Sequence, residues 1–131
     1  MQGVTKFFDR VKGWGFIVDT ENQNDVFIHH SSIKMNGFRY LDEDDIVNFE
    51  IGTGNNGREQ AVDVTPILTK KMIEKSLKQE KLHVKTVADP HATCHLYMVV
   101  NDKDEPLSSE QGMNFIELAA FAGFDTEGLY A

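Results

Sequence analysis

Residues 6–17, KFFDRVKGWGFI, and residues 25–30, DVFIHH, decide how the first half of this chain folds. Both stretches are rich in aromatic and β-branched residues, which favour β-strands. Successive side chains of a strand point to opposite faces, so alternation separates an aliphatic set from an aromatic set. The aliphatic set is Ile17, Val26 and Ile28, and the aromatic set is Trp14, Phe16, Phe27 and His29.

Five short β-prone runs lie between Gly3 and Pro66, and turn-forming segments such as residues 21–25 and 52–57 separate them. Five strands at this spacing predict a small closed barrel, which leaves no strand edge exposed. Branched aliphatic side chains are expected to fill its interior, namely Val4, Ile17, Val26, Ile28, Val47 and Ile51.

Aromatic side chains on the outer face have no core to enter, so they predict a ligand surface. Every nucleobase offers a π-face, and stacking on an aromatic side chain is worth ~1–3 kcal/mol per base. Gly13 and Gly15 flank Trp14 and would let a nucleotide approach the backbone. The structural alternative is that these rings are core residues or cross-strand packing pairs.

The net charge of −8 argues against a polycation that simply wraps around phosphates. Residues 1–66 hold six basic and eleven acidic side chains, whereas residues 67–85 hold six Lys against Glu74 and Glu80. Stacking therefore has to supply most of the affinity of the first half for a nucleic acid.

The segment from Gly3 to Pro66 resembles the bacterial cold-shock protein family. Residues 6–17 are similar to the family's first ribonucleoprotein motif, and residues 25–33, DVFIHHSSI, are similar to its second. Residues 36–51 and 61–67 follow in the family's order and spacing. The resemblance implies a mainly β fold, with residues 1–66 forming a five-stranded antiparallel OB-type barrel that binds single-stranded RNA or DNA.

The resemblance also implies which residues bind. It places stacking residues at Phe7, Phe8, Trp14, Phe16, Phe27, His29, His30 and Phe38. Further contacts, to phosphates or base edges, are placed at Lys6, Lys12, Arg58 and Asp25.

Three positions depart from the family pattern. The family usually has Trp where this chain has Phe7 and Phe where it has Trp14, so the largest ring has moved to the next strand. His30 stands at a position that is usually Phe, and a protonated imidazole attracts phosphate below about pH 6.5. The loop GTGNNGRE, residues 52–59, is one residue longer than expected, which affects the placement of Arg58.

After Pro66 the hydrophobic period changes to that of a helix. Over residues 67–82 one half of the helical wheel is apolar, with Leu68, Met72, Ile73 and Leu77. The other half is basic, with Lys70, Lys71, Lys75, Lys78 and Lys81. This basic face is either a solvated surface or an extension of the nucleic-acid surface, with phosphate contacts from Lys71, Lys75 and Lys78.

The remainder of residues 67–131 predicts a small α+β extension in the order helix, two strands, helix. The strands are expected at residues 82–88 and 94–100, the second with one face formed by Cys94, Leu96, Met98 and Val100. The last helix is expected to start with a capping box of Ser108 and Gln111 and to stop at Gly123.

The apolar residues of this last helix surround most of its circumference, so it has to be buried. They are Met113, Phe115, Ile116, Leu118 and Phe121. The covering surface is either the two strands, the barrel or a second copy of the chain. Coverage by a second copy would make the protein a homodimer.

A metal site and catalysis are both weighed and set aside. His91, Cys94 and His95, with His83 and Asp89 nearby, match no structural zinc spacing, and Cys94 is the only thiol. The run Asp42–Asp45 is interpreted as a solvated turn. The sequence supports no catalytic triad and contains no phosphate loop, so we expect no enzymatic activity, no metal and no cofactor.

A single cysteine, no apolar run near ~20 residues and no secretory leader favour a cytoplasmic protein that does not contact a membrane. The leading hypothesis is an RNA chaperone or single-stranded DNA binder that acts by base stacking. The alternative is a regulatory adaptor in which residues 67–131 bind a protein partner while the barrel tethers RNA or serves as scaffold. A metal-dependent nuclease that uses the His/Cys cluster ranks last.

Overall fold

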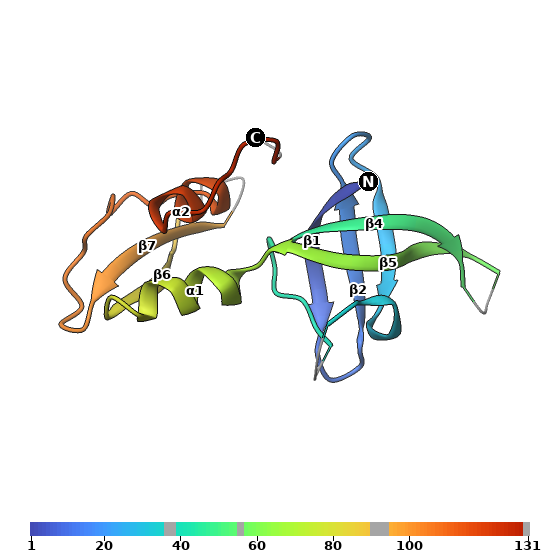
Figure 1. The fold of residues 1–131 in the computed structure, drawn as a ribbon, viewed down its shortest axis with the longest axis horizontal. Helices are drawn as coiled ribbons and strands as arrows, with labels where there is room; N and C mark the ends of the chain where they lie inside the picture. Colours follow the sequence, from blue (N-terminus) through green and yellow to red (C-terminus); the bar gives the residue numbers. More distant parts are fainter. Residues whose placement is uncertain (36–38, 55–56, 90–94, 130–131) are drawn as a thin grey trace. The chain divides into compact units, whose positions relative to one another are not determined.

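The computed structural model describes residues 1–35, 39–54, 57–89 and 95–129. The chain divides into two compact units, Met1–Lys70 and Lys71–Ala131. The first unit contains five strands, and the second contains two strands, the helix α2 and all of the helix α1 except its first residue (Figure 1).

The first unit is one antiparallel sheet. Its strands are β1 (Gln2–Asp9), β2 (Trp14–Asp19), β3 (Asp25–His29), β4 (Ile46–Thr53) and β5 (Glu59–Leu68). Their order in the sheet is β3-β2-β1-β4-β5, and each neighbouring pair is antiparallel. A short 3-10 helix, η1 (His30–Ser32), follows β3 directly. The expected mainly β fold with five antiparallel strands is confirmed.

The expected closure of this sheet into a barrel is wrong at the level of strand pairing. β3 and β5 lie at the two ends of the sheet, and the described residues form no ladder between them. One parallel bridge joins Ile33 to Val64, and the Lys34 N–H donates to the Val64 carbonyl at 2.7 Å. The four antiparallel pairings make β3 and β5 run in the same direction, and η1 ends β3 before a parallel ladder develops. We call the unpaired boundary between β3 and β5 the seam.

The core of the first unit contains three of the expected interior residues. Ile17, Ile28 and Val47 are fully buried, and Val26 packs against them. The other buried members of this core are Ile33, Leu41, Phe49, Ala61 and Val64.

Two interior expectations are wrong. Val4 is half-buried, because the buried positions on β1 are its neighbours Gly3 and Thr5. Ile51 is 38% exposed, because it follows a register shift between β4 and β5. Phe49 takes the interior position instead, and its ring would lie 2.9 Å from a Cβ on Gly3. Glycine at that position therefore makes room for an aromatic core residue.

The second unit has the expected order of helix, two strands and helix. Its elements are α1 (Lys70–Lys78), β6 (Leu82–Val87), β7 (Leu96–Asn101) and α2 (Phe115–Phe121), with β6 and β7 antiparallel. α2 packs on β7, where the ring centroids of Phe115 and Tyr97 are 6.3 Å apart. The buried apolar residues of this unit are Ile73, Leu77, Tyr97, Val99, Val100, Phe115, Leu118 and Ala119.

α1 is shorter than residues 67–82, because β5 continues to Leu68 before the helix starts. Leu68 pairs with Ile46 and is 3% exposed. Within α1, Ile73 and Leu77 are buried, whereas Met72 is exposed. The helix therefore buries a narrower apolar stripe than the sequence predicted.

β7 buries residues on both of its faces. Tyr97 and Val99 are buried on one face and Val100 on the other, whereas Leu96 and Met98, which share the face of Val100, are only half-buried. Residues 96–100 are apolar on both faces, so alternation cannot identify the side that α2 covers. Cys94, which was expected on the same face as Leu96, lies outside the described residues.

α2 starts later than expected, with a different capping box. The Glu117 N–H donates to Asn114 Oδ1 at 2.8 Å, and the Asn114 N–H donates to Glu117 Oε1 at 3.0 Å. The expected box of Ser108 and Gln111 is wrong, because Ser108 Oγ instead accepts the Val99 N–H of β7 at 2.8 Å.

The end of α2 agrees with the sequence, but its burial does not. Gly123 has a φ of 93° just after the helix, a conformation that suits glycine, and so acts as the expected stop. Phe121 is 43% exposed, so the expected burial around most of the circumference is wrong. Only one side of α2, with Phe115, Leu118 and Ala119, is buried.

Candidate nucleic-acid interface

The aromatic residues predicted to bind bases are neighbours on one face of the sheet. Phe7, Phe16 and Phe27 are partners across β1, β2 and β3, and Trp14 is the partner of His29 in the next row. These positions alternate along β2 and β3 with the buried core positions, so they lie on the opposite face. We call Phe7, Trp14, Phe16 and Phe27 the aromatic face.

Trp14 lies at the centre of the aromatic face. Its ring centroid is 5.8 Å from that of Phe7, 6.0 Å from Phe16 and 6.1 Å from Phe27. Phe7 and Phe16 meet it edge-on, whereas Phe27 is inclined by only 26°. Phe7 is 40% exposed, and the other three rings are half-buried by contact with one another. This contact orders the rings in advance, so stacking a base on them costs little side-chain entropy.

Phe8 is placed differently from the other expected stacking residues. It pairs with Gly15 and packs against the core. Phe7 and Phe8 are successive residues of β1, so they face opposite sides of the sheet. The sequence already carried this signal, because successive residues of a regular strand point to opposite faces.

Gly13 and Gly15 are required by the close packing of the fold, and the expected approach of a nucleotide to the backbone there stays a prediction. A Cβ on Gly15 would lie 2.1 Å from the Phe7 carbonyl oxygen, so glycine is what lets β1 and β2 approach each other. Gly13 has a φ of +77°, and a Cβ there would meet His30 Cδ2 at 2.5 Å. The close neighbours of both glycines are parts of the protein itself.

Two adjacent histidines extend the row of Trp14. The ring centroids of His29 and His30 are 4.3 Å apart, and His29 Nδ1 lies 2.7 Å from Ser31 Oγ. The His30 side chain is exposed, and the His30 backbone N–H donates to the Gly13 carbonyl at 2.8 Å. The hydrogen bond to Ser31 fixes the orientation of the His29 ring next to Trp14.

The residues that were expected to contact phosphates or base edges have different surroundings. Lys6 Nζ forms an ion pair with Asp25 Oδ2 at 3.0 Å, so each of these residues already has a partner. Lys12 is exposed, and among the described residues no carboxylate pairs with its ammonium group. Arg58 is also exposed. Phe38 lies outside the described residues.

Arg10 holds two loops together, a contact that the sequence analysis missed. Its guanidinium lies 4.0 Å above the centroid of the Tyr40 ring and forms an ion pair with Asp42. Arg10 belongs to the β1–β2 turn, whereas Tyr40 and Asp42 belong to the segment between η1 and β4. No local pattern reveals such a contact, because it joins positions about thirty residues apart.

Asp45, at the end of the acidic run, is buried, so the expected solvated turn is wrong for this residue. Its exposed fraction is 2%, and its carboxylate accepts N–H groups from Lys70 at 2.8 Å and Asp42 at 2.9 Å. Burial raises the pKa of Asp45 to about 7, and the charges of Asp42 and Asp44 add to the rise, while the two N–H donors oppose it. Asp45 therefore binds the last residue of the first unit, Lys70.

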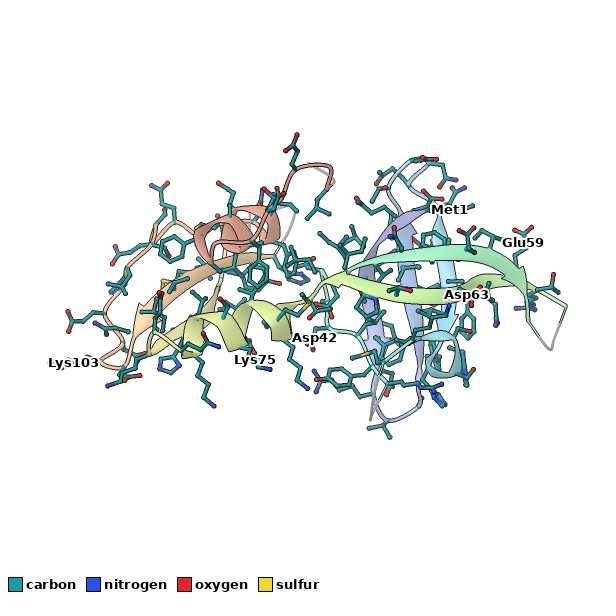
Figure 2. The ribbon with its side chains drawn as sticks, in the orientation of Figure 1. Met1, Asp42, Glu59, Asp63, Lys75 and Lys103 are labelled. Atoms are coloured by element: carbon teal, nitrogen blue, oxygen red, sulfur yellow. The ribbon has the colours of Figure 1, made fainter. Side chains whose placement is uncertain are left out.

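The basic residues of α1 are exposed. Lys71, Lys75 and Lys78 lie outside the buried stripe of the helix, and Figure 2 labels Lys75. Lys75 and Lys78 occupy its last turn, where cations also suit the helix dipole.

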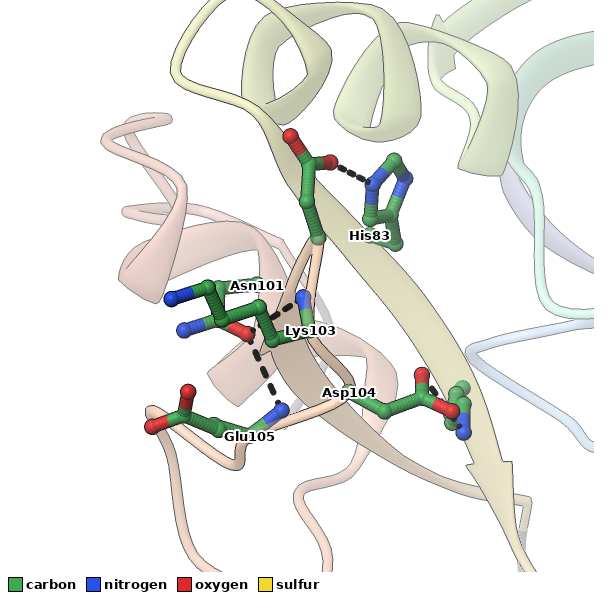
Figure 3. Close-up of polar contacts among 7 residues, drawn as sticks. His83, Asn101, Lys103, Asp104 and Glu105 are labelled. Atoms are coloured by element: carbon green, nitrogen blue, oxygen red, sulfur yellow. Dashed lines mark hydrogen bonds and ion pairs between the residues drawn. The ribbon is translucent and has the colours of Figure 1, made fainter.

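The histidine cluster does not form a metal site among the described residues. His83 Nε2 lies 2.6 Å from Asp102 Oδ1 across the β6–β7 hairpin, and Lys85 pairs with Asp104 at 2.8 Å (Figure 3). In residues 1–35, 39–54, 57–89 and 95–129, no three His, Cys, Asp or Glu side chains converge on one point. His91 and Cys94 lie outside these ranges.

Neither helix of the described chain is long and apolar enough to cross a bilayer.

An antiparallel sheet with an aliphatic core on one face and clustered aromatic residues on the other is typical of OB-type nucleic-acid-binding domains. Residues 1–67 match the 'Cold-shock' DNA-binding domain family. The chain belongs to this family, which binds nucleic acids and is not enzymatic. The resemblance seen in the sequence is confirmed.

Similar proteins occur in bacteria and plants. The chain is 48% identical over 64 residues to a cold shock protein of Arthrobacter globiformis, a match that covers 49% of this chain and 94% of that relative. It is 48% identical over 61 residues to a cold shock-like protein of Thermotoga maritima, covering 47% of this chain and 91% of the relative. It is 45% identical over 64 residues to glycine-rich protein 2 of Nicotiana sylvestris, covering 49% and 30%. This chain therefore matches less than a third of that plant relative's length.

Proposed function

We propose that this chain binds single-stranded RNA or DNA by stacking bases on the aromatic face, and that it acts in the cytoplasm as an RNA chaperone or single-stranded DNA binder. The observation that carries this proposal is the contact of Trp14 with Phe7, Phe16 and Phe27 on the face away from the core. Unpaired bases can reach such a surface, whereas the bases of a duplex are stacked on one another.

The charge of the chain supports stacking as the main source of affinity. The net charge is −8, and Lys6 on β1 is already paired with Asp25. Phosphate contacts from Lys12, Arg58 and the α1 residues Lys71, Lys75 and Lys78 would add a smaller, salt-dependent contribution. His29 and His30 lie beside Trp14 and extend the stacking surface.

The double variant Phe16→Ala/Phe27→Ala tests the proposal and keeps Trp14 as a fluorescent reporter. We expect it to lose about 2 kcal/mol or more of binding free energy for a labelled single strand, because two stacking positions disappear. The measurement is a titration of single- and double-stranded RNA and DNA against both proteins.

Leu107→Ala is the matched control, since Leu107 is a 51% exposed apolar residue of the second unit. Urea unfolding of each variant is measured to check that the sheet is intact. Unchanged single-strand affinity in the double variant would contradict stacking on this face.

A second candidate function is that of a regulatory adaptor, in which residues 67–131 bind a protein partner or a second copy of this chain. The second unit has its own buried core, and its exposed apolar side chains include Leu107 and Phe121, at 51% and 43% exposure. The same titration separates the two functions. An intact chain that binds no single strand would favour the adaptor.

A further inference from the structure

A cavity of about 480 Å³ lies where β3 and β5 fail to pair. β3 contributes Asp25 and Phe27 to its lining, the β2–β3 loop contributes Asn22 and Asn24, and β5 contributes Glu59. Figure 2 shows Met1 and Glu59, which both line the cavity, at the same end of the sheet. Its volume is in the range of small-molecule binding sites and is ample for one nucleobase.

The cavity is continuous with the aromatic face through Phe27. The Phe27 ring centroid lies 5.9 Å from Phe16 and 6.1 Å from Trp14, and Phe27 also lines the cavity. A strand whose bases stack on Trp14 and Phe16 can therefore extend along Phe27 to the mouth of the cavity. The occupant of the cavity is expected to belong to the same strand.

Several polar groups in the lining have hydrogen-bonding capacity to spare. Among the described residues, the Glu59 carboxylate and the Asn24 side-chain amide have no hydrogen-bond or ion-pair partner. Asn22 Oδ1 accepts the Asn24 N–H at 2.9 Å, which leaves the Asn22 NH₂ group available. Carboxylate oxygens accept only, and side-chain amides both donate and accept.

The charges of the lining decide which part of a strand enters. The lining carries the carboxylates of Asp19, Asp25 and Glu59 against the single positive charge of the Met1 amino group, so its net charge is negative and disfavours the sugar–phosphate backbone. No three of the described acidic, His or Cys side chains converge closely enough to hold a metal ion. A neutral base edge with adjacent N–H donors remains as the group that a free carboxylate binds best.

Guanine is the base that meets this requirement, because N1–H and the N2 amino group are adjacent donors that a carboxylate accepts in a bidentate manner. Adenine, cytosine, thymine and uracil do not present two adjacent donors on their pairing edge. We propose that the seam cavity reads guanine within a bound single strand, with Glu59 accepting from N1–H and N2–H and Asn24 donating to O6. This inference rests on the proposed single-strand binding.

A guanine scan tests the proposal. One guanine is moved through each position of a short oligo(dT), and binding is measured by fluorescence anisotropy of a labelled strand. We expect guanine at one position to tighten binding at least about fivefold, which is the low end of the discrimination from one bidentate pair. Inosine, which lacks the N2 amino group, is expected to lose most of this gain at the same position.

Glu59→Gln and Glu50→Gln are the matched variants. Both residues are exposed carboxylates on neighbouring strands, but Glu50 does not line the cavity. Each variant removes one negative charge, so both change the affinity for unsubstituted oligo(dT) to a similar extent. We expect Glu59→Gln to abolish the preference for guanine and Glu50→Gln to retain it.

Two results would overturn the guanine site while leaving single-strand binding intact. The first is that oligo(dT) binds but guanine gives no gain at any position. The second is a guanine preference that survives Glu59→Gln. A chain that binds no single strand at all would overturn the proposed function, and this inference with it.

Discussion

Trp14 and Phe7 show how a change of residue type can keep a surface while moving its centre. Phe7 is the more exposed ring, and Trp14, on the central strand of the three, contacts three other rings. The larger indole therefore lies in the middle of the aromatic face, where bases arriving from either side can reach it. This position makes Trp14 fluorescence a direct reporter of a ligand on that face.

Asp45 makes stability depend on pH in a direction opposite to that of most carboxylates. Its folded-state pKa of about 7 exceeds the ordinary value of 3.8, so the folded chain holds a proton that the unfolded chain has already released. The free energy of unfolding therefore falls as pH rises from about 4 through about 7, and above that range the loss is complete. We expect the free energy of unfolding to fall by an amount on the order of a few kcal/mol across this pH range.

Asp45→Asn, which removes the titrating group, is expected to remove this decline. The measurement is urea unfolding at a series of pH values, followed by Trp14 fluorescence. Asp63→Asn is the control, because Asp63 is an exposed carboxylate paired with Lys34 at 3.4 Å and its loss should leave the pH profile unchanged. Parallel pH profiles for the wild type and Asp45→Asn would contradict the raised pKa.

At the scale of elements, α1 is the one concentration of positive charge in an acidic chain. Lys71, Lys75 and Lys78 are exposed on it. If these residues contact phosphates, each contributes about 0.7 to the slope of log affinity against log salt concentration for a single strand. We expect the triple variant with Glu at these positions to weaken binding and to reduce that slope by about 2.

Lys103→Glu is the control for this charge reversal, because Lys103 lies outside α1, in the turn that follows β7 (Figure 3). It should change the slope much less than the α1 variant. If the triple variant keeps both the affinity and the slope of the wild type, the basic face of α1 is a solvated surface.

At the scale of the whole molecule, the first unit has what it needs to fold alone. It has its own core, and relatives such as the Arthrobacter globiformis protein consist of little more than the matching segment. The unit extends past the expected boundary at Pro66, because Leu68 pairs with Ile46 and the Lys70 N–H donates to Asp45. Residues 1–70 are therefore the natural fragment.

We expect residues 1–70 to unfold cooperatively in urea and to bind single strands with the stacking contribution intact. A fragment of residues 1–66 should be less stable, since it loses the Leu68 pairing and the Lys70 N–H donor to Asp45. Urea unfolding and the single-strand titration of both fragments check this. An unfolded 1–70 fragment would show that the second unit is required for the fold of the first.

The sequence alone was sufficient to predict the strands of the first unit, the separation of Ile17 and Ile28 from Trp14 and Phe16, and the family. These features depend on local periodicity and on motifs within a few residues of one another. The same reasoning failed for Ile51 and for the start of α2. At each of these places the outcome depends on a bulge or on a neighbour that is distant in the sequence.

Only the tertiary structure decided the seam, the burial of Asp45 and the contacts between distant loops. The open seam depends on where β3 ends relative to β5, which no residue of either strand specifies alone. The burial of Asp45 and the contact of Arg10 with Tyr40 likewise join separate segments. Periodicity records which side of its own strand a residue occupies, whereas cavities, buried charges and loop contacts arise only when segments far apart in the chain meet.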